Sequence, residues 1–126
     1  MPLPDELIKI LEEKDLEVTK KRGAIRATSM TLPVSLLIKY KNKNVWIEIE
    51  PGEELSDVLV DLIESGEDIK DMVEDVLSEL RDIAIEVSRF LEEKGYSVEL
   101  RLREGENDVR DALEDIVEEY EELEEE

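Results

Sequence analysis

The chain has 126 residues, of which 42% are charged and 40% apolar, and its formal net charge is −21. Length and apolar content together predict one globular domain over residues 1–126. Histidine and cysteine are both absent, which excludes Ser-His and Cys-His catalysis, zinc sites built from these residues, and disulfides. Because no long uncharged apolar stretch and no signal-peptide pattern is present, we expect a cytoplasmic protein that does not enter membranes.

Charge is unevenly distributed along the chain. Residues 18–47 contain no acid, and the bases in that stretch are Lys20, Lys21, Arg22, Arg26, Lys39, Lys41 and Lys43. The remaining residues are strongly acidic, so most of the surface should repel polyanions while one region attracts anions. Many ionic side chains without glutamine or cysteine are typical of a thermophile, a bias that an idealised design would share.

The first half of the chain is predicted to form one helix followed by four strands. Apolar spacing predicts a short helix over residues 3–11, opened by Pro4 and Asp5. Strands at 15–21 and 24–30 follow around a turn at Arg22-Gly23, and Pro33 marks a bend.

The clearest strands are residues 34–41 and 45–50, which alternate apolar and polar residues. Their apolar faces coincide only if Ile38 lies opposite Ile47, which requires a two-residue loop at Asn42-Lys43. On the outer face this register places three pairs opposite each other: Lys39 and Trp46, Lys41 and Asn44, and Leu37 and Glu48.

The second half is mainly helical. Apolar residues at helical spacing begin at Leu55 and predict one amphipathic helix. The same spacing continues for seven turns over residues 68–94 and predicts a second helix about 40 Å long. Residues 96–103 read as a fifth strand with Val98, Leu100 and Leu102 facing inward. Gly105 is expected to form a turn, Asn107 or Asp108 to cap a last helix, and residues 121–126 to be a frayed acidic tail.

The element order α-β-β-β-β-α-α-β-α predicts an α+β fold. A four-strand meander and one later strand would form a mainly antiparallel five-stranded sheet, with about four helices on one face. One such sheet is too small to cover the apolar stripes of four helices, so we expect a homodimer formed through the long helix.

Acidic clusters are the remaining candidates for catalysis. Glu114, Asp115, Glu118 and Glu119 share one helix, and Asp71, Glu74 and Asp75 share another. Such carboxylates could hold magnesium for an enzyme acting on a phosphorylated or nucleotide substrate. With 37 acids such spacings arise by chance, so we interpret them as solvated faces. We therefore predict no catalytic residues, no metal-binding residues and no cofactor.

Two surfaces are candidates for binding. On the outer face of the hairpin, Leu37, Lys39, Lys41 and Trp46 come together with Arg26; the alternative is a tryptophan that merely lies under the Lys39 stem. On the long helix, Ile85 lies opposite the apolar stripe near Arg81 and Arg89, although a lone exposed isoleucine is common.

The favoured function is a non-enzymatic interaction or regulatory module that binds another protein. Element order and acidity also resemble small α/β dimers that act as secretion chaperones, which implies chaperone-like binding. A nucleic-acid mimic is a further alternative. Nucleic acid itself is disfavoured as a partner, because the surface is acidic and only one tryptophan can stack.

Overall fold

The computed structural model of the protein describes residues 3–124. Its elements are α1 (Asp5–Glu13), β1 (Glu17–Lys21), β2 (Ala24–Thr28), β3 (Val34–Lys41), β4 (Asn44–Pro51), α2 (Leu55–Glu64), α3 (Ile69–Glu93), β5 (Ser97–Arg101) and α4 (Arg103–Glu124). The strands form one sheet in the order β1-β2-β3-β4-β5, antiparallel except for the parallel pair β4 and β5. The α+β class, the element order and the mainly antiparallel sheet are confirmed.

The β3–β4 hairpin has the predicted register. Ile38 lies opposite Ile47, Tyr40 lies opposite Val45, and the loop is Asn42-Lys43. Asn42 has a φ of 57°, the left-handed conformation that asparagine tolerates better than most residues. The three outer-face pairs expected from this register are all present.

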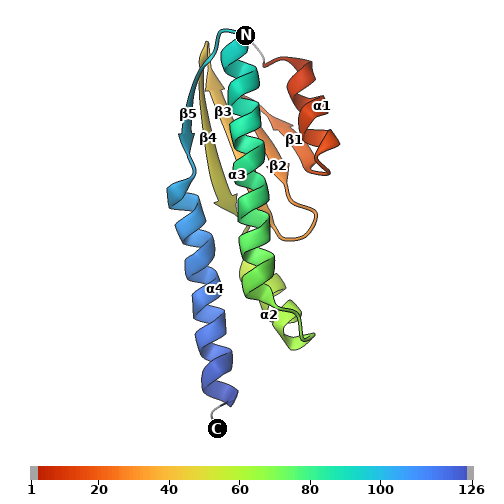
Figure 1. Ribbon diagram of the computed structural model, residues 1–126, viewed down its shortest axis with the longest axis vertical. Helices are drawn as coiled ribbons and strands as arrows, with labels where there is room; N and C mark the ends of the chain where they lie inside the picture. Colours follow the sequence, from red (N-terminus) through yellow and green to blue (C-terminus); the bar gives the residue numbers. More distant parts are fainter. Residues whose placement is uncertain (1–2, 125–126) are drawn as a thin grey trace.

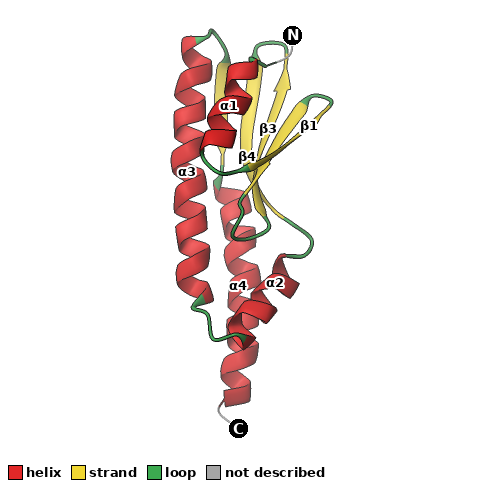
Figure 2. Cartoon of the chain, turned by 90° about the vertical axis from the view of Figure 1, so that its right-hand side faces the viewer, coloured by secondary structure: helices red, strands yellow, loops and turns green. Residues whose placement is uncertain are grey.

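Helix α3 lies across one face of the sheet, with α1 beside it, whereas no helix covers the other face within residues 3–124 (Figures 1 and 2). Helices α2 and α4 extend beyond the end of the sheet, where they run beside the first half of α3. The apolar stripe of α3, which includes Val73, Leu80 and Val87, is buried within one chain. The dimer through α3 was predicted because the sheet was expected to be too small to cover the apolar stripes of the helices. Since the stripe of α3 is buried within one chain, that reason does not hold, and the dimer remains an untested prediction.

The junction between β5 and α4 differs from expectation. Strand β5 ends at Arg101, and Leu100, expected to face inward into the core, is 41% exposed because β5 is the outermost strand. Helix α4 begins at Arg103, so neither Asn107 nor Asp108 caps it. The backbone N–H of Glu106 donates to the Leu102 carbonyl at 3.0 Å, which starts the helix earlier than predicted.

Gly105 lies in the first turn of α4 and does not form a turn between elements. A Cβ placed on it would lie 1.7 Å from the backbone oxygen of Ile49. Only glycine therefore lets α4 approach the backbone of β4 at this point. At its other end α4 continues to Glu124; residues 125–126 lie outside the described range, and fraying of the tail stays a prediction.

No helix among residues 3–124 combines the length and apolar character needed to cross a membrane.

We expect thermal unfolding above about 80 °C at neutral pH, because surface ion pairs become more useful as temperature rises. Such pairs include Lys14–Glu86 at 3.0 Å, which joins α1's end to α3. Added salt should raise the midpoint, since it screens the self-repulsion of the −21 charge. Calorimetry at low and high salt checks both statements, and a midpoint of about 45–65 °C, ordinary for mesophile domains, would contradict the first.

Candidate functional site

The uncovered face of the sheet carries two complete rows of side chains, set by strand register. Across β1 to β5, the first row is Lys21, Ala24, Lys39, Trp46 and Glu99. The second row is Thr19, Arg26, Leu37, Glu48 and Arg101. We call this uncovered face of the sheet, with its two rows of side chains, the open face. All five binding residues predicted for the hairpin face lie on it, and Lys41 lies beside the first row, opposite Asn44.

Trp46 is half-buried near the centre of the open face. The Arg101 guanidinium lies 5.8 Å from the centre of its ring. The expected cation, Lys39, instead turns to Glu48, with its Nζ 3.0 Å from a carboxylate oxygen. Sequence reasoning missed Arg101 because nothing in the sequence states that β5 lies parallel to β4.

The basic strip expected on this face is shorter than predicted. Arg26 donates to Glu50 at 3.0 Å and Lys39 forms an ion pair with Glu48, so two of the expected cations are paired with acids of β4. The reason is register: Lys39 on β3 lies beside Glu48 on β4, and Arg26 on β2 reaches across β3 to Glu50, two residues further along β4. Lys41, by contrast, is exposed at the hairpin end.

Positive charge gathers at the end of the sheet that carries the β1–β2 and β3–β4 turns. Lys21, Arg22, Lys41 and Lys43 lie in or beside these turns. The Lys43 ammonium lies 4.6 Å from the centre of the Tyr96 ring, which anchors the hairpin turn to the start of β5. The opposite end of the sheet leads into the acidic α2 and α4. The fold thus brings cations from two separate turns together at one end of the sheet.

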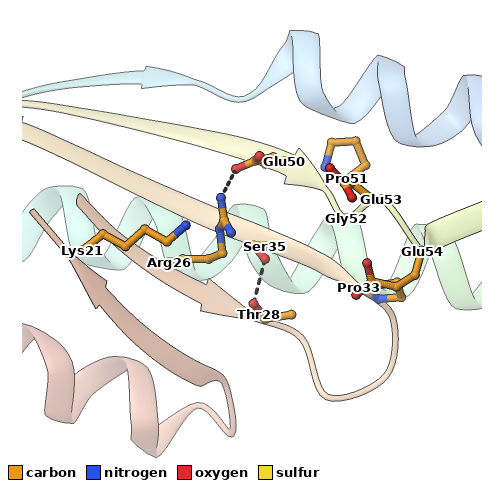
Figure 3. A pocket seen from close by; sticks show the side chains of 10 residues that line it. All are labelled: Lys21, Arg26, Thr28, Pro33, Ser35, Glu50, Pro51, Gly52, Glu53 and Glu54. Atoms are coloured by element: carbon orange, nitrogen blue, oxygen red, sulfur yellow. Dashed lines mark hydrogen bonds and ion pairs between the residues drawn. The ribbon is translucent and has the colours of Figure 1, made fainter. Parts of the chain in front are cut away.

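Two hollows lie along the open face. One of about 500 Å³ includes Lys21, Arg26, Ser35 and Gly52 in its lining (Figure 3). A second of about 420 Å³ is lined by Leu37, Lys39 and Arg101, among others, together with the first turns of α4. Both hollows include Glu50 and Pro51, so they adjoin. The Arg26 Nε atom is buried beside the first hollow and has no hydrogen-bond partner within the described residues.

The second predicted surface, on α3, is only partly assembled. Ile85 is half-buried and, with Asp82, Glu86 and Arg89, lines a shallow hollow of about 490 Å³. Arg81 is instead directed to α4, where it binds Glu106 through two hydrogen bonds. Ile85 and Arg89 therefore share a surface, while the exposed Arg81 joins α3 to α4 through Glu106.

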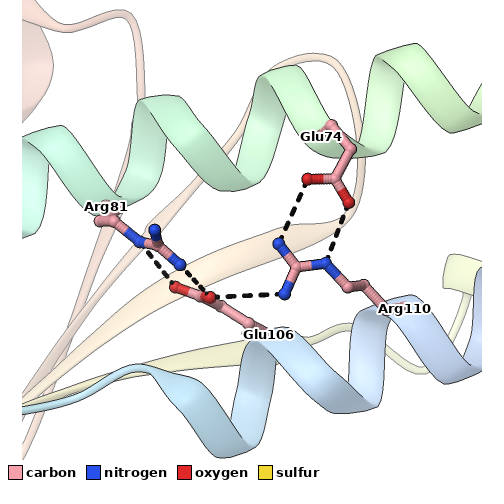
Figure 4. Close-up of polar contacts among 4 residues, drawn as sticks. All are labelled: Glu74, Arg81, Glu106 and Arg110. Atoms are coloured by element: carbon pink, nitrogen blue, oxygen red, sulfur yellow. Dashed lines mark hydrogen bonds and ion pairs between the residues drawn. The ribbon is translucent and has the colours of Figure 1, made fainter.

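Arg81 belongs to an ionic network between α3 and α4 (Figure 4). Glu106 is only 3% exposed and is bound by Arg81 and, at 3.6 Å, by Arg110. Arg110 also donates to Glu74, at 2.9 and 3.2 Å, and thereby holds the pKa of Glu74 below its usual value. This network, which the sequence did not reveal, fixes α4 against α3 where the helix leaves the sheet.

Replacing Glu106 with glutamine should lower the free energy of unfolding by about 1–2 kcal/mol, because a buried charge-assisted contact to two arginines is lost. Glu74→Gln is the matched control, since that carboxylate contacts the same Arg110 but is 55% exposed. Its loss should be under about 0.5 kcal/mol. Urea unfolding of both variants measures the difference, and equal losses would contradict a special role for the buried carboxylate.

The acidic clusters considered for magnesium give no metal site in the part of the chain that the structure describes, where no group of three or more potential ligands is placed to hold an ion.

The fold and the open face define an α+β protein with one helix-covered sheet face and one amphipathic face free of helices in residues 3–124. No protein-family model matches the chain, and no curated protein or solved structure does either.

Proposed function

We propose that the chain is a non-enzymatic interaction module that binds an acidic segment of another protein on the open face. One observation carries this proposal: Trp46 lies half-buried on a sheet face without a covering helix, in the same row as Lys21 and Lys39. A partly exposed aromatic ring with Lys39 and Arg101 beside it, on a protein of net charge −21, is a typical anchor for an anionic partner.

Charge and apolar contact have separate roles in this proposal. The cations at the turn end, with Lys41 foremost, attract an acidic segment from a distance and speed its association. Trp46 and Leu37 then supply the apolar area that slows dissociation. Arg101, stacked on the indole, holds the ring in place and limits the conformational entropy lost on binding.

The adjoining hollows set the direction in which the segment lies. A chain anchored at Trp46 and continuing past Leu37 reaches the hollow that Lys21, Arg26 and Ser35 help to line. Glu48 and Glu50 border this path and repel a continuous polyanion. This favours a peptide with spaced acids and an apolar residue over nucleic acid.

Peptide-display selection against the protein tests the proposal. Enriched peptides should combine acids with at least one large apolar residue, and NMR shifts on binding should cluster on β3 and β4. Lys39→Glu with Lys41→Glu should mainly slow association, and more so at low salt. Arg89→Glu on α3 reverses a comparable charge elsewhere and should leave the rate nearly unchanged. Shifts centred on Ile85 would refute this location.

A further inference from the structure

The outer edge of β5 is an unpaired strand edge. β5 pairs with β4 alone within the described chain, and Figure 1 shows it at the border of the sheet with α4 leading away from it. Unpaired edges can pair with another chain unless they are blocked. The opposite edge, β1, is flanked by α1 and carries Lys20, whose ammonium lies 3.9 Å from Asp5 of that helix. β5 has no such cover, and its Leu100 is 41% exposed.

The hydrogen-bonding groups of β5 alternate between its two sides. The backbone N–H of Ser97 donates to the Lys43 carbonyl at 2.8 Å, so the groups of Ser97 point toward the main sheet. Since backbone groups alternate in direction along a strand, those of Val98 and Leu100 point away from β4, toward the free edge. The exposed Leu100 is thus also a position with free pairing groups.

The sequence of β5 is complementary to itself in one antiparallel register. When Leu100 is placed opposite Leu100 of a second copy, Glu99 faces Arg101 of that copy, and Arg101 faces its Glu99. Val98 then lies opposite Leu102, which follows the end of β5 and whose carbonyl accepts the Glu106 N–H, so the paired strand residues are 99–101 of each copy. Shifting the register by two residues would set Glu99 against Glu99, which costs free energy because like charges meet. Charge therefore disfavours this shift, whereas in the first register the ion pair that Arg101 and Glu99 form within each copy meets its counterpart and Leu100 gains an apolar neighbour.

We propose that two copies of this chain associate through their β5 edges, antiparallel and with Leu100 on the twofold axis, to form one continuous ten-stranded sheet. The axis is perpendicular to the sheet, so the open faces of both copies point the same way. Arg101, which stacks on Trp46, then lies at the border between the two open faces. The proposal does not depend on what the open face binds.

The association should be weak. In this register only residues 99–101 of each β5 are paired, which is below the size of most stable interfaces, and each copy carries a net charge of −21. We expect a dissociation constant in the micromolar range at physiological ionic strength. Sedimentation equilibrium on the full chain over a wide concentration range measures it, and a strict monomer at about 0.5 mM, well above any micromolar constant, overturns the proposal.

Charge reversal tests the register. Glu99→Arg and Arg101→Glu each place like charges opposite each other in a homodimer, and each should weaken association about tenfold. An equimolar mixture of the two variants restores both cross-strand pairs and should return the affinity close to that of the original chain. A general structural effect of either substitution would not be rescued by mixing. Failure of the mixture to associate overturns this register.

A single cysteine tests the axis, because the chain has none of its own. Opposed residues of a hydrogen-bonded antiparallel pair lie about 5.5 Å apart at Cα, within reach of a disulfide. Leu100→Cys should therefore oxidise to a covalent dimer. Met30→Cys, in a loop where the side chain is 73% exposed, is the control and should not. Cross-linking through Ile85→Cys with none through Leu100→Cys would overturn the proposal in favour of a dimer through α3.

Discussion

Gly105→Ala is expected to lower the free energy of unfolding by about 3 kcal/mol or more, the upper end of what overpacking costs. The added Cβ would meet the Ile49 carbonyl oxygen at 1.7 Å and its carbon at 2.6 Å. Both are backbone atoms of β4, so no side-chain rotation relieves the overlap. Helix α4 must instead shift away from the sheet, and the contact between Glu106 and Arg81 one residue later is strained with it.

Gly66→Ala is the control for this prediction. Gly66 has a φ of +84° and open space around its Cβ position, so alanine there costs only backbone strain, about 1–2 kcal/mol. Urea unfolding of both variants gives the comparison, and hydrogen exchange should show faster opening of α4 in Gly105→Ala alone. If Gly105→Ala proved no more costly than the control, the close approach of α4 and β4 would be contradicted.

Trp46→Ala is expected to cost at least ~2 kcal/mol of binding to an acidic peptide selected on the original chain, as for the anchor of an interface. The loss in folding stability should be smaller, roughly 1 kcal/mol, because the indole is half-buried and gives up mainly the stacked Arg101. Calorimetric titration with the peptide measures the first quantity, and urea unfolding the second.

Ile85→Ala provides the control, since it truncates a half-buried apolar side chain on α3. It should leave the peptide affinity unchanged. Two results would count against the open face as the binding site: unfolding of Trp46→Ala, or Trp46 fluorescence that is blue-shifted and resists quenchers in the free protein. Either would mean that Trp46 belongs to the core.

The elements of the first half of the chain were predictable because their information is local. Alternation over residues 34–41 and 45–50 identifies both strands, and the requirement that apolar faces coincide fixes the register and the loop. The seven-turn stripe likewise predicts α3, and Asp68 does cap it by accepting a hydrogen bond from the Asp71 N–H at 3.2 Å.

The predicted start of α4 was wrong because a glycine such as Gly105 can indicate either a turn or a position inside a helix where another backbone approaches closely. Glycine commonly marks a turn, yet here it lies inside a helix because the backbone of β4 occupies the place of a side chain. Acids in the first turn, Glu104 and Glu106, favour a helix N-terminus and were available as evidence. The close approach itself is a long-range contact, which local sequence does not encode.

For the candidate site, the sequence by itself determined which residues of the hairpin share the outer face, because strand alternation and hairpin register are local. It also determined that cations gather in residues 18–47. Only the tertiary structure decided which of them are paired: Arg26 with Glu50, and Arg101 over Trp46, across strands whose order the chain does not state. Pairing between segments far apart in sequence follows from how the whole sheet packs on α3, and that packing arises only when the entire core forms.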